Sequence, residues 1–299
     1  MDGAMTTKPP VQPDILAPVP PCGQSLVFRM ALESDPRPAL ARLRKGFDPA
    51  WGVVGLGDPL MKTIGAALPG LRPFPALSGP GCGVPSTQAA LWVFLRGEER
   101  GEVFDRCESI RALLGDAFVL EEGTDVFVYA GGRDLTGYED GTENPQGDEA
   151  VAAALVASGT DMAGSSYVAV QRWVHDLEHF RGHPQAEQDD IIGRRRADNE
   201  EFDEAPASAH VKRAAQESFE PEAFMLRRSM PWAGAQERGL VFVAFGADLD
   251  RYERVLRRMA GLEDGITDAL FTFSRPVTGG YYWCPPLKAG RLDLSVLEP

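Results

Sequence analysis

The sequence predicts an α+β fold made of two similar halves, and the main evidence is an internal repeat. An apolar segment at residues 91–97 precedes a helical stretch at 103–114, and an apolar segment at 240–246 precedes a helical stretch at 249–259. The two apolar segments start 149 residues apart (240 − 91 = 149), about half of the 299-residue chain. Self-similarity at a fixed spacing indicates a duplicated unit. The order strand, helix, strand, strand, helix, strand in each half is typical of a ferredoxin-like unit with an antiparallel sheet.

The first half begins after a proline-rich arm. Six prolines within residues 9–21 predict an extended segment without helix over residues 1–22. The apolar run at 25–30 then predicts the first strand, and residues 39–64 have a mainly helical pattern. We expect that helical pattern to be interrupted near Gly52–Gly57.

The later elements follow from the same kind of pattern. Residues 68–85 are dense in glycine and proline, which predicts a long ordered loop. The run at 124–129 closes the first half as a strand. A strand at 166–172 opens the second half, and we expect that half to close near residues 272–274.

Length and composition permit two domains and exclude some partners. The chain is long enough for a ferredoxin-like domain at 23–145, with a polar loop at its end, and a second at 146–299. A content of 43% hydrophobic and 25% charged residues is typical of a soluble globular protein. The net charge of −14 argues against a nucleic-acid partner, because a polyanion requires a basic surface. No apolar run approaches the length that crosses a bilayer, so no membrane partner is expected.

The N-terminal segment and the cysteines indicate a cytoplasmic protein. Residues 1–8 lack the basic and apolar regions of a signal peptide. The four cysteines, at positions 22, 82, 107 and 284, show no spacing typical of a metal site. In a reducing compartment such thiols stay free.

A polar loop at residues 137–145 (GYEDGTENP) is the most informative segment of the chain. It contains an Asp-Gly step and an Asn-Pro stop and has no apolar periodicity. An Asp-Gly step is also a common tight turn without function. The alternative is that the loop presents the Asp140 carboxylate to a ligand near the junction of the two halves, where pockets tend to form.

The four histidines divide into a cluster and a single residue. His175, His179 and His183 are spaced four residues apart, and the first two would share one face of a helix. We prefer a solvated helix face to a metal site there, because no acid or cysteine stands in register and the Gly-x-Pro sequence at 182–184 ends the helix.

His210 stands apart from the cluster and follows a turn of small residues, where a histidine is ordinarily a cap or a surface group. The strand predicted at 224–232 follows it, and alternation along that strand points Arg227 inward and Arg228 to the other face. Asp140, His210 and Arg227 together fit one kind of site.

Several segments, taken in order, resemble the dye-decolorizing peroxidases, a family of haem enzymes, and in particular their bacterial cytosolic kinds (types B and P). The match extends from about residue 15 to near the C-terminus. The matching segments are Gly70-Leu71-Arg72-Pro73-Phe74-Pro75, the GxxDG signature at Gly137-x-x-Asp140-Gly141, Ile192-Gly193-Arg194, Ala209-His210, Leu226-Arg227-Arg228-Ser229-Met230-Pro231 and Arg275-Pro276-Val277-Thr278-Gly279-Gly280-Tyr281-Tyr282. GxxDG alone is a weak signal, but the set together is strong.

The resemblance implies a role for each matching residue. His210 would be the proximal ligand of the iron of haem b (iron protoporphyrin IX), held mainly by the second half. Asp140 and Arg227 would lie over the distal face. Arg194 would pair with a haem propionate. Ser229 would line the distal pocket, where some relatives place an asparagine.

Asp268 matches an acid that in relatives accepts a hydrogen bond from the proximal histidine. The alternative role for Asp268 is to cap a helix or strand. An acceptor on the second ring nitrogen fixes the tautomer and orientation of a metal-bound histidine. On the distal side, Asp140 can move a proton between the two peroxide oxygens, and Arg227 can stabilise the developing charge. The planar fork of Arg194 suits a carboxylate.

The implied function is the reduction of H2O2 with oxidation of dyes, phenols or similar small organic reductants through a high-valent iron-oxo state. One alternative is a protein that stores or delivers haem, or releases its iron, with incidental peroxidase activity. Another is an idle cargo or scaffold protein. The resemblance allows a homo-oligomer, and no tail for docking in an encapsulating shell is evident beyond Leu297-Glu298-Pro299.

Five oxidisable aromatic residues could relay electrons from bulky substrates to haem. For each of them we prefer packing in the core. They are Trp173, Trp232, Tyr281, Tyr282 and Trp283.

Overall fold

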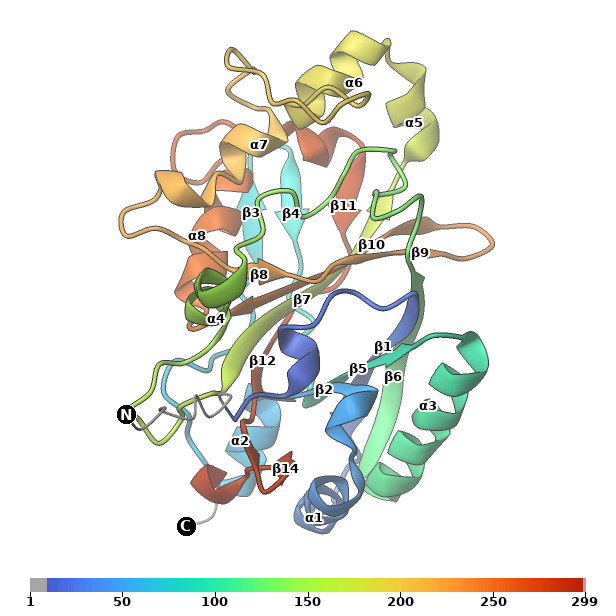
Figure 1. Cartoon of the computed structure of the whole chain (residues 1–299), viewed down its shortest axis with the longest axis vertical. Coiled ribbons are helices and arrows are strands. Elements are labelled where there is room, and N and C mark those ends of the chain that lie inside the picture. The colour runs from blue at the N-terminus through green and yellow to red at the C-terminus, as the bar shows by residue number, and fades with distance from the viewer. Residues whose placement is uncertain (1–9, 298–299) are drawn as a thin grey trace, which may run out of the picture.

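One ten-stranded sheet runs through the computed structural model, which describes residues 10–297 (Figure 1). Along the sheet the strands follow the order β6-β1-β5-β2-β12-β7-β10-β8, and β11 and β9 pair with β7 and β10. The strand pairs are antiparallel. The predicted α+β class with antiparallel strands is confirmed.

The first four strands of that order form one ferredoxin-like unit. Its elements are β1 (Cys22–Met30), α1 (Arg37–Gly46), β2 (Gly52–Gly57), β5 (Leu91–Gly97), α3 (Arg100–Leu114) and β6 (Phe118–Phe127). The last strand of the unit pairs with the first, and the first pairs with the third. Helix α3 buries Val103, Cys107, Ile110 and Leu114, which recur at helical spacing on one face.

The other half repeats this arrangement. Its elements are β7 (Ser166–His175), β8 (Leu226–Arg227), β9 (Met230–Ala233), β10 (Arg238–Gly246), α8 (Asp250–Met259) and β12 (Gly280–Cys284). The order β12-β7-β10-β8 matches β6-β1-β5-β2, so β5 and β10 hold the same place in their units. The predicted duplication is therefore confirmed, whereas the boundary at residues 145 and 146 stays a prediction.

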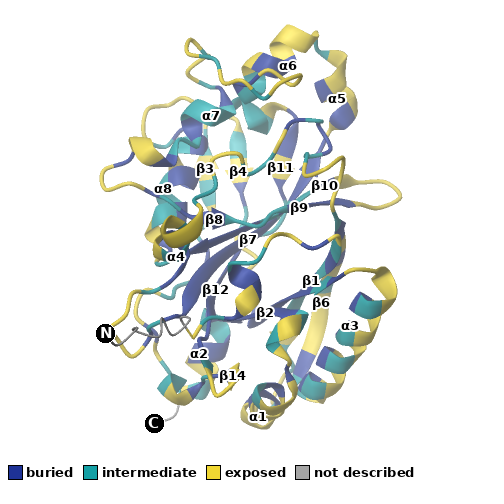
Figure 2. Ribbon diagram, in the orientation of Figure 1, coloured by how far each residue is buried: buried dark blue, intermediate teal, exposed yellow. Residues whose placement is uncertain are grey.

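The two units join edge to edge. Strand β12 lies between β7 of its own unit and β2 of the other, pairing with β2 at Tyr282↔Gly57 and Trp283↔Leu56. Apolar residues pack into two main clusters along this sheet. Figure 2 shows the central strands as almost wholly buried, while the outer helices expose one side. Every residue of β2 is buried.

Shorter elements cover the ends of the sheet. They are α2 (Asp58–Ile64), β3 (Leu77–Gly79), β4 (Cys82–Val84), α4 (Gly147–Ala154), α5 (Leu177–Gly182), α6 (Gln185–Ile192), α7 (His210–Arg213), β11 (Ser274–Pro276), β13 (Leu287–Lys288), β14 (Arg291–Leu292), and 3-10 helices at Pro13–Ile15, Pro49–Trp51, Gly115–Ala117, Gln216–Ser218, Ala269–Thr272 and Ser295–Leu297.

Three expectations about these elements were wrong. The break in the helical pattern at Gly52–Gly57 is strand β2, because its valines and leucine fill the core on both faces of the sheet. The second unit closes with β12 rather than near residues 272–274, where a 3-10 helix ends and only the short β11 begins. The proline-rich arm contains a 3-10 turn at Pro13–Ile15, and its residues before Pro10 lie outside the described part.

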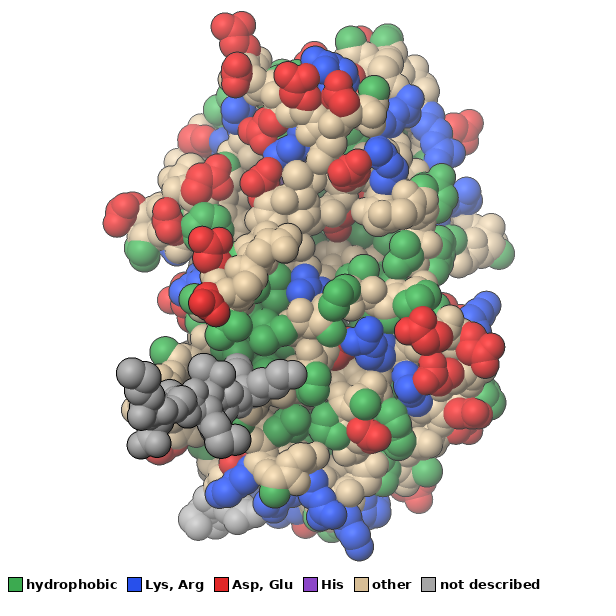
Figure 3. All heavy atoms as spheres, viewed as in Figure 1, with side chains coloured by type: hydrophobic (Ala, Val, Ile, Leu, Met, Phe, Trp, Pro, Cys, Tyr) green, Lys and Arg blue, Asp and Glu red, His purple; other side chains and the backbone are tan. Residues whose placement is uncertain are grey.

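The surface carries side chains of both charges (Figure 3), and the cysteines form no disulfides. Figure 3 shows acidic and basic side chains interspersed on one face, with a group of basic side chains over α1 at the lower end. All four cysteines are free thiols. Within residues 10–297, none of the helices has the length and apolar character that a membrane crossing requires.

Candidate active site

A largely apolar cavity lies in the second half, beside α7 and α8. It holds about 970 Å³ of space, part of it open to solvent. Apolar side chains of β7, β10 and α8 form much of its wall. The first half contributes the residues Asp134, Thr136, Tyr138, Glu139 and Asp140.

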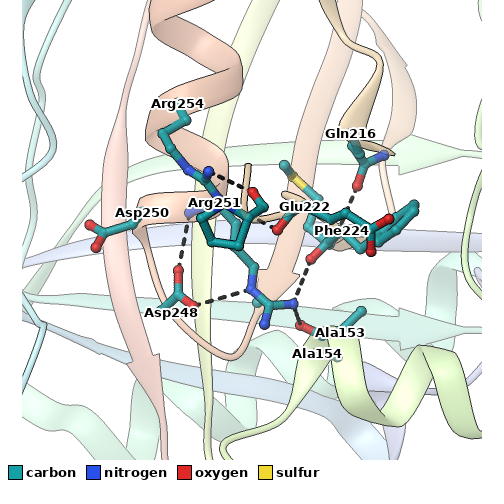
Figure 4. Close-up of polar contacts among 12 residues, drawn as sticks. Ala153, Ala154, Gln216, Glu222, Phe224, Asp248, Asp250, Arg251 and Arg254 are labelled. Atoms are coloured by element: carbon teal, nitrogen blue, oxygen red, sulfur yellow. Dashed lines mark hydrogen bonds and ion pairs between the residues drawn. The ribbon is translucent and has the colours of Figure 1, made fainter. Parts of the chain in front are cut away.

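One end of the wall is braced by α8 (Figure 4). Arg251 donates from Nη1 to the carbonyl of Phe224, at 2.9 Å, and to that of Ala153 in α4, at 3.5 Å. Within the braced segment, the Gln216 side chain accepts a hydrogen bond from the N–H of Met225 at 2.7 Å. Gln216 and Met225 both line the cavity, so these contacts hold its wall in place.

His210 lines the cavity from the first position of α7, and its ring is held by Asp268. The Nδ1 atom lies 2.8 Å from Asp268 Oδ2. The Asp268 side chain is fully buried, and its Oδ1 accepts a hydrogen bond from the N–H of Leu270 at 2.8 Å. Asp268 is thus both the cap of a 3-10 helix and the partner of His210. With Nδ1 engaged, Nε2 is the ring nitrogen left to bind a ligand.

The polar loop at 137–145 turns at two glycines. Gly137 and Gly141 have φ of +91° and +76°, a region that side chains disfavour. A Cβ on Gly141 would also lie 2.8 Å from Asn144 Nδ2. Glycine is therefore required after Asp140, because this turn needs a positive φ and has no room for a Cβ.

Asn144 ties this loop to β8. Its Oδ1 accepts from the N–H of Arg227 at 2.8 Å, and its Nδ2 donates to the Arg227 carbonyl at 3.0 Å. The amide side chain thereby makes the two hydrogen bonds to the Arg227 backbone that a neighbouring strand would make. In the sequence Asn144 stands out only as part of an Asn-Pro stop, although an asparagine side chain can form the same hydrogen bonds as a backbone amide.

Asp140 and Arg227 meet at the cavity. Arg227 Nη1 lies 3.8 Å from Asp140 Oδ1, an ion pair without a hydrogen bond. Buried Arg227 Nε has no hydrogen-bond partner within residues 10–297. Arg228 points away and donates to the carbonyl of Leu16 at 3.0 Å, so the predicted alternation is observed.

Ser229 lies outside the main cavity. Its hydroxyl accepts from the N–H of Val243 at 3.3 Å, which fixes it against β10. It lines an adjoining pocket that shares Asp134, Asp140 and Arg227 with the main cavity.

Arg194 is also outside the cavity wall and already has carboxylate partners. Its Nη2 lies 2.8 Å from Glu143 Oε1 and 2.6 Å from Glu201 Oε2, and its Nη1 donates to the carbonyl of Asn199 at 3.2 Å. Gly193 before it has φ of +90° and lies so close to α7 that a Cβ would approach Val211 Cγ2 to 2.3 Å.

The remaining histidines lie at the end of strand β7, in helix α5 and at the C-terminal cap of α5. His175 is the last residue of strand β7 and is not on a helix. The prediction that it shares a helix face with His179 was therefore wrong. His179 and His183 are 3.5 Å apart at Nε2, and His183 Nδ1 lies 2.9 Å from Glu187. Residues 10–297 contain no group of three or more His, Cys, Asp or Glu residues arranged to hold a metal ion.

The five oxidisable aromatic residues are all buried, as core packing predicts. Trp173 in addition lines the cavity and packs against Phe271 at 5.4 Å between ring centroids. An electron relay through them stays a prediction.

Comparison with known proteins adds a family match and close structural likeness. Residues 131–289 match the family described as Dyp-type peroxidase, C-terminal. A dye-decolorizing peroxidase of Mycobacterium tuberculosis is 34% identical over 224 residues, or 73% of this chain and 67% of that protein. One from Mycolicibacterium paratuberculosis is 30% identical over 300 residues, or 93% and 84%.

The fold is similar to that of solved structures over nearly the whole chain. A dye-decolorizing protein from V. cholerae has a TM-score of 0.85 at 27% identity, covering 97% of this chain and 99% of that one. A variant of DypB from Rhodococcus jostii RHA1, in complex with heme, has a TM-score of 0.83 at 29% identity and covers 91% and 95%.

Proposed function

We propose, on the premise that this chain belongs to the dye-decolorizing peroxidase family of haem enzymes, that its haem lies in the cavity lined by His210 and reacts with H2O2 beside Asp140 and Arg227. One observation carries the proposal: His210, whose Nδ1 is held by the buried Asp268, lines the same apolar cavity as the Asp140–Arg227 ion pair. The protein is a haem-dependent peroxidase. The proposal concerns which residues bind the haem and which act on the peroxide.

The residues of the cavity fit a porphyrin. Its walls are mainly apolar, as a flat apolar cofactor requires. His210 offers Nε2 with its tautomer fixed, and Arg227 keeps an unpaired buried Nε. We assign His210 as the iron ligand and Asp268 as the acceptor that orients it.

Bound haem supplies the redox-active iron at which peroxide reacts. Asp140 takes a proton from one peroxide oxygen and returns it to the other, directly or through water. Arg227 places a fixed positive charge beside the oxygen that departs as water, and its guanidinium does not lose its proton. Asn144 keeps the two groups in register by holding the Arg227 backbone to the Asp140 loop.

Arg194 and Ser229 have secondary parts in the proposal. Arg194 has five N–H donors, so a propionate can join or displace Glu143 and Glu201 at its guanidinium. Ser229 borders the space beside Asp140 and shapes access to it from the adjoining pocket.

The absorption spectrum of the purified, haem-reconstituted protein, before and after H2O2, tests the proposal. We expect a Soret band that changes on peroxide addition and sustained oxidation of a dye or phenol. A haem carrier would exchange its haem readily with little peroxide-dependent rate, and a scaffold would show no Soret band. The family match favours the enzyme over both.

The reductant and the location are finer proposals. We propose dyes and phenols as reductants, which would give up electrons at the protein surface or cavity mouth. We also propose a cytoplasmic location, which the four free thiols support.

Substitution of Asp268 by asparagine should raise the Fe(III)/Fe(II) potential. The neutral amide keeps the shape but accepts the His210 Nδ1–H hydrogen bond less strongly, so less electron density reaches the iron. Haem affinity should fall by about 10–100-fold, the usual cost of losing such a partner. A spectroelectrochemical titration measures the potential, and an unshifted value in a variant that binds haem would leave Asp268 only its capping role.

A further inference from the structure

Three side chains from separate parts of the chain form a continuous hydrogen-bonded line. His175 Nδ1 lies 2.7 Å from Ser274 Oγ, and His175 Nε2 lies 3.2 Å from Asp134 Oδ1. The register of the sheet explains the first contact, because Ser274 of β11 stands directly opposite His175 of β7. The mechanism above uses none of these three residues.

The line joins two spaces. Ser274 and His175 line a surface pocket beside α5, while His175 and Asp134 line the cavity of His210 and Asp140. The His175 and Ser274 side chains are themselves buried, so the line crosses the protein between the two openings. Its outer pocket has a mixed-charge rim formed by Asp176, Glu178, Arg181, Glu237, Arg238 and Arg275.

The partners fix the direction of each hydrogen bond. The second oxygen of Asp134 accepts from the N–H and the hydroxyl of Thr136, at 2.8 and 2.7 Å. Burial by itself would raise the pKa of Asp134, but the hydrogen bonds from His175 and Thr136 lower it below 3.8 overall. An ionised Asp134 can only accept, so Nε2 of His175 donates to it, and in the neutral imidazole Nδ1 then accepts from the Ser274 hydroxyl.

We propose that Ser274, His175 and Asp134 form a proton relay from the surface pocket to the haem cavity. Reduction of one H2O2 to two waters consumes two protons and two electrons. When the reductant supplies electrons alone, the protons must reach the cavity from solvent. The proposal rests on the proposed function, because it supplies protons to the reaction at Asp140.

Each transfer conserves the proton. Solvent in the outer pocket gives a proton to Ser274 Oγ while the hydroxyl proton passes to His175 Nδ1. The imidazolium, stabilised by Asp134, releases its Nε2 proton to Asp134 Oδ1. Asp134 then yields that proton to water in the cavity, which carries it to Asp140 on the same loop. The pass leaves the imidazole as the Nδ1–H tautomer, and exchange of its ring protons with water, one lost from Nδ1 and one gained at Nε2, restores the starting tautomer before the next transfer.

The first test determines the His175 tautomer in the resting protein and needs no catalytic turnover. Nitrogen NMR of the full chain loaded with diamagnetic gallium(III) protoporphyrin IX should show His175 as the Nε2–H tautomer. Replacement of Ser274 by alanine should shift the Nδ1 resonance, since it loses its donor. An Nδ1–H tautomer in the wild type would overturn the proposal.

The second test measures turnover per bound haem with H2O2 and ferrocyanide, which gives electrons but no protons. Ser274→Ala and His175→Gln should each lower it by about 10–100-fold and change the solvent isotope effect. This is less than the ~10²–10⁴ expected for a group that touches peroxide, because solvent also enters through the cavity mouth. Ser274→Thr, which keeps a hydroxyl, should restore most of the rate.

Thr272→Ala is the matched control, since Thr272 lines the same outer pocket but lies outside the line. It should turn over like the wild type. Wild-type turnover and isotope effect in Ser274→Ala would overturn the relay and leave the proposed function intact. A reconstituted wild type without turnover would overturn both.

Discussion

Replacement of His210 by alanine is expected to leave the protein folded but nearly free of haem. In the proposed site, Nε2 of this residue is the iron ligand, while Nδ1 is held by Asp268. Loss of a mere hydrogen-bonding partner of a metal ligand costs about 10–100-fold in affinity, so loss of the ligand should cost more than ~100-fold. The ratio of Soret to protein absorbance after reconstitution measures the effect, and circular dichroism checks the fold.

Arg194→Ala provides the comparison. Apolar burial of the porphyrin would still hold the cofactor when one propionate contact is lost, so haem occupancy should fall less than in His210→Ala. An alanine variant of His210 with wild-type haem content and ferric spectrum would contradict the assignment of the ligand.

The second large effect is expected at the distal pair. Asp140→Asn should slow the reaction of the ferric enzyme with H2O2 by about 10²–10⁴ if Asp140 is the proton shuttle. Arg227→Leu should slow it by about 10²–10³, the cost of one preorganised electrostatic donor. Stopped-flow absorbance at the Soret band gives both rates.

Arg228→Leu is the control for the distal pair, because Arg228 follows directly in the chain but points to the carbonyl of Leu16. It should react with H2O2 at nearly the wild-type rate once its fold and haem content are verified. If Asp140→Asn and Arg227→Leu both keep the wild-type rate, the distal pair has no part in the reaction. If only one does, that residue is a spectator.

The fold was readable from the sequence where the pattern repeats. Strands β5 and β10 have similar apolar sequences 149 residues apart, and the structure places them at the same position in two units. Strand β2 was missed because Gly52–Gly57 was judged on glycine content, whereas its burial depends on strands that lie far away in sequence.

The sequence suggested the residues of the proposed site one by one, but not the contacts between them. Resemblance and chemistry identified Asp140, His210, Arg227 and Asp268, and the structure brings them to one cavity or its first contacts. No local pattern reveals that Asn144 grips the backbone of Arg227, or that Ser274 stands opposite His175. Such contacts depend on register between distant strands, which single-residue chemistry does not specify.

The place of β12 has a consequence for how the protein matures. This strand lies near the end of the chain, and it covers the edges of both β2 and β7. During synthesis the GxxDG loop leaves the ribosome long before β12. Until β12 emerges, β2 and β7 each keep an open strand edge that can pair wrongly. Insertion of β12 joins the two units into one sheet. We therefore expect a chain truncated before β12 to expose the edges of β2 and β7 and to bind haem poorly.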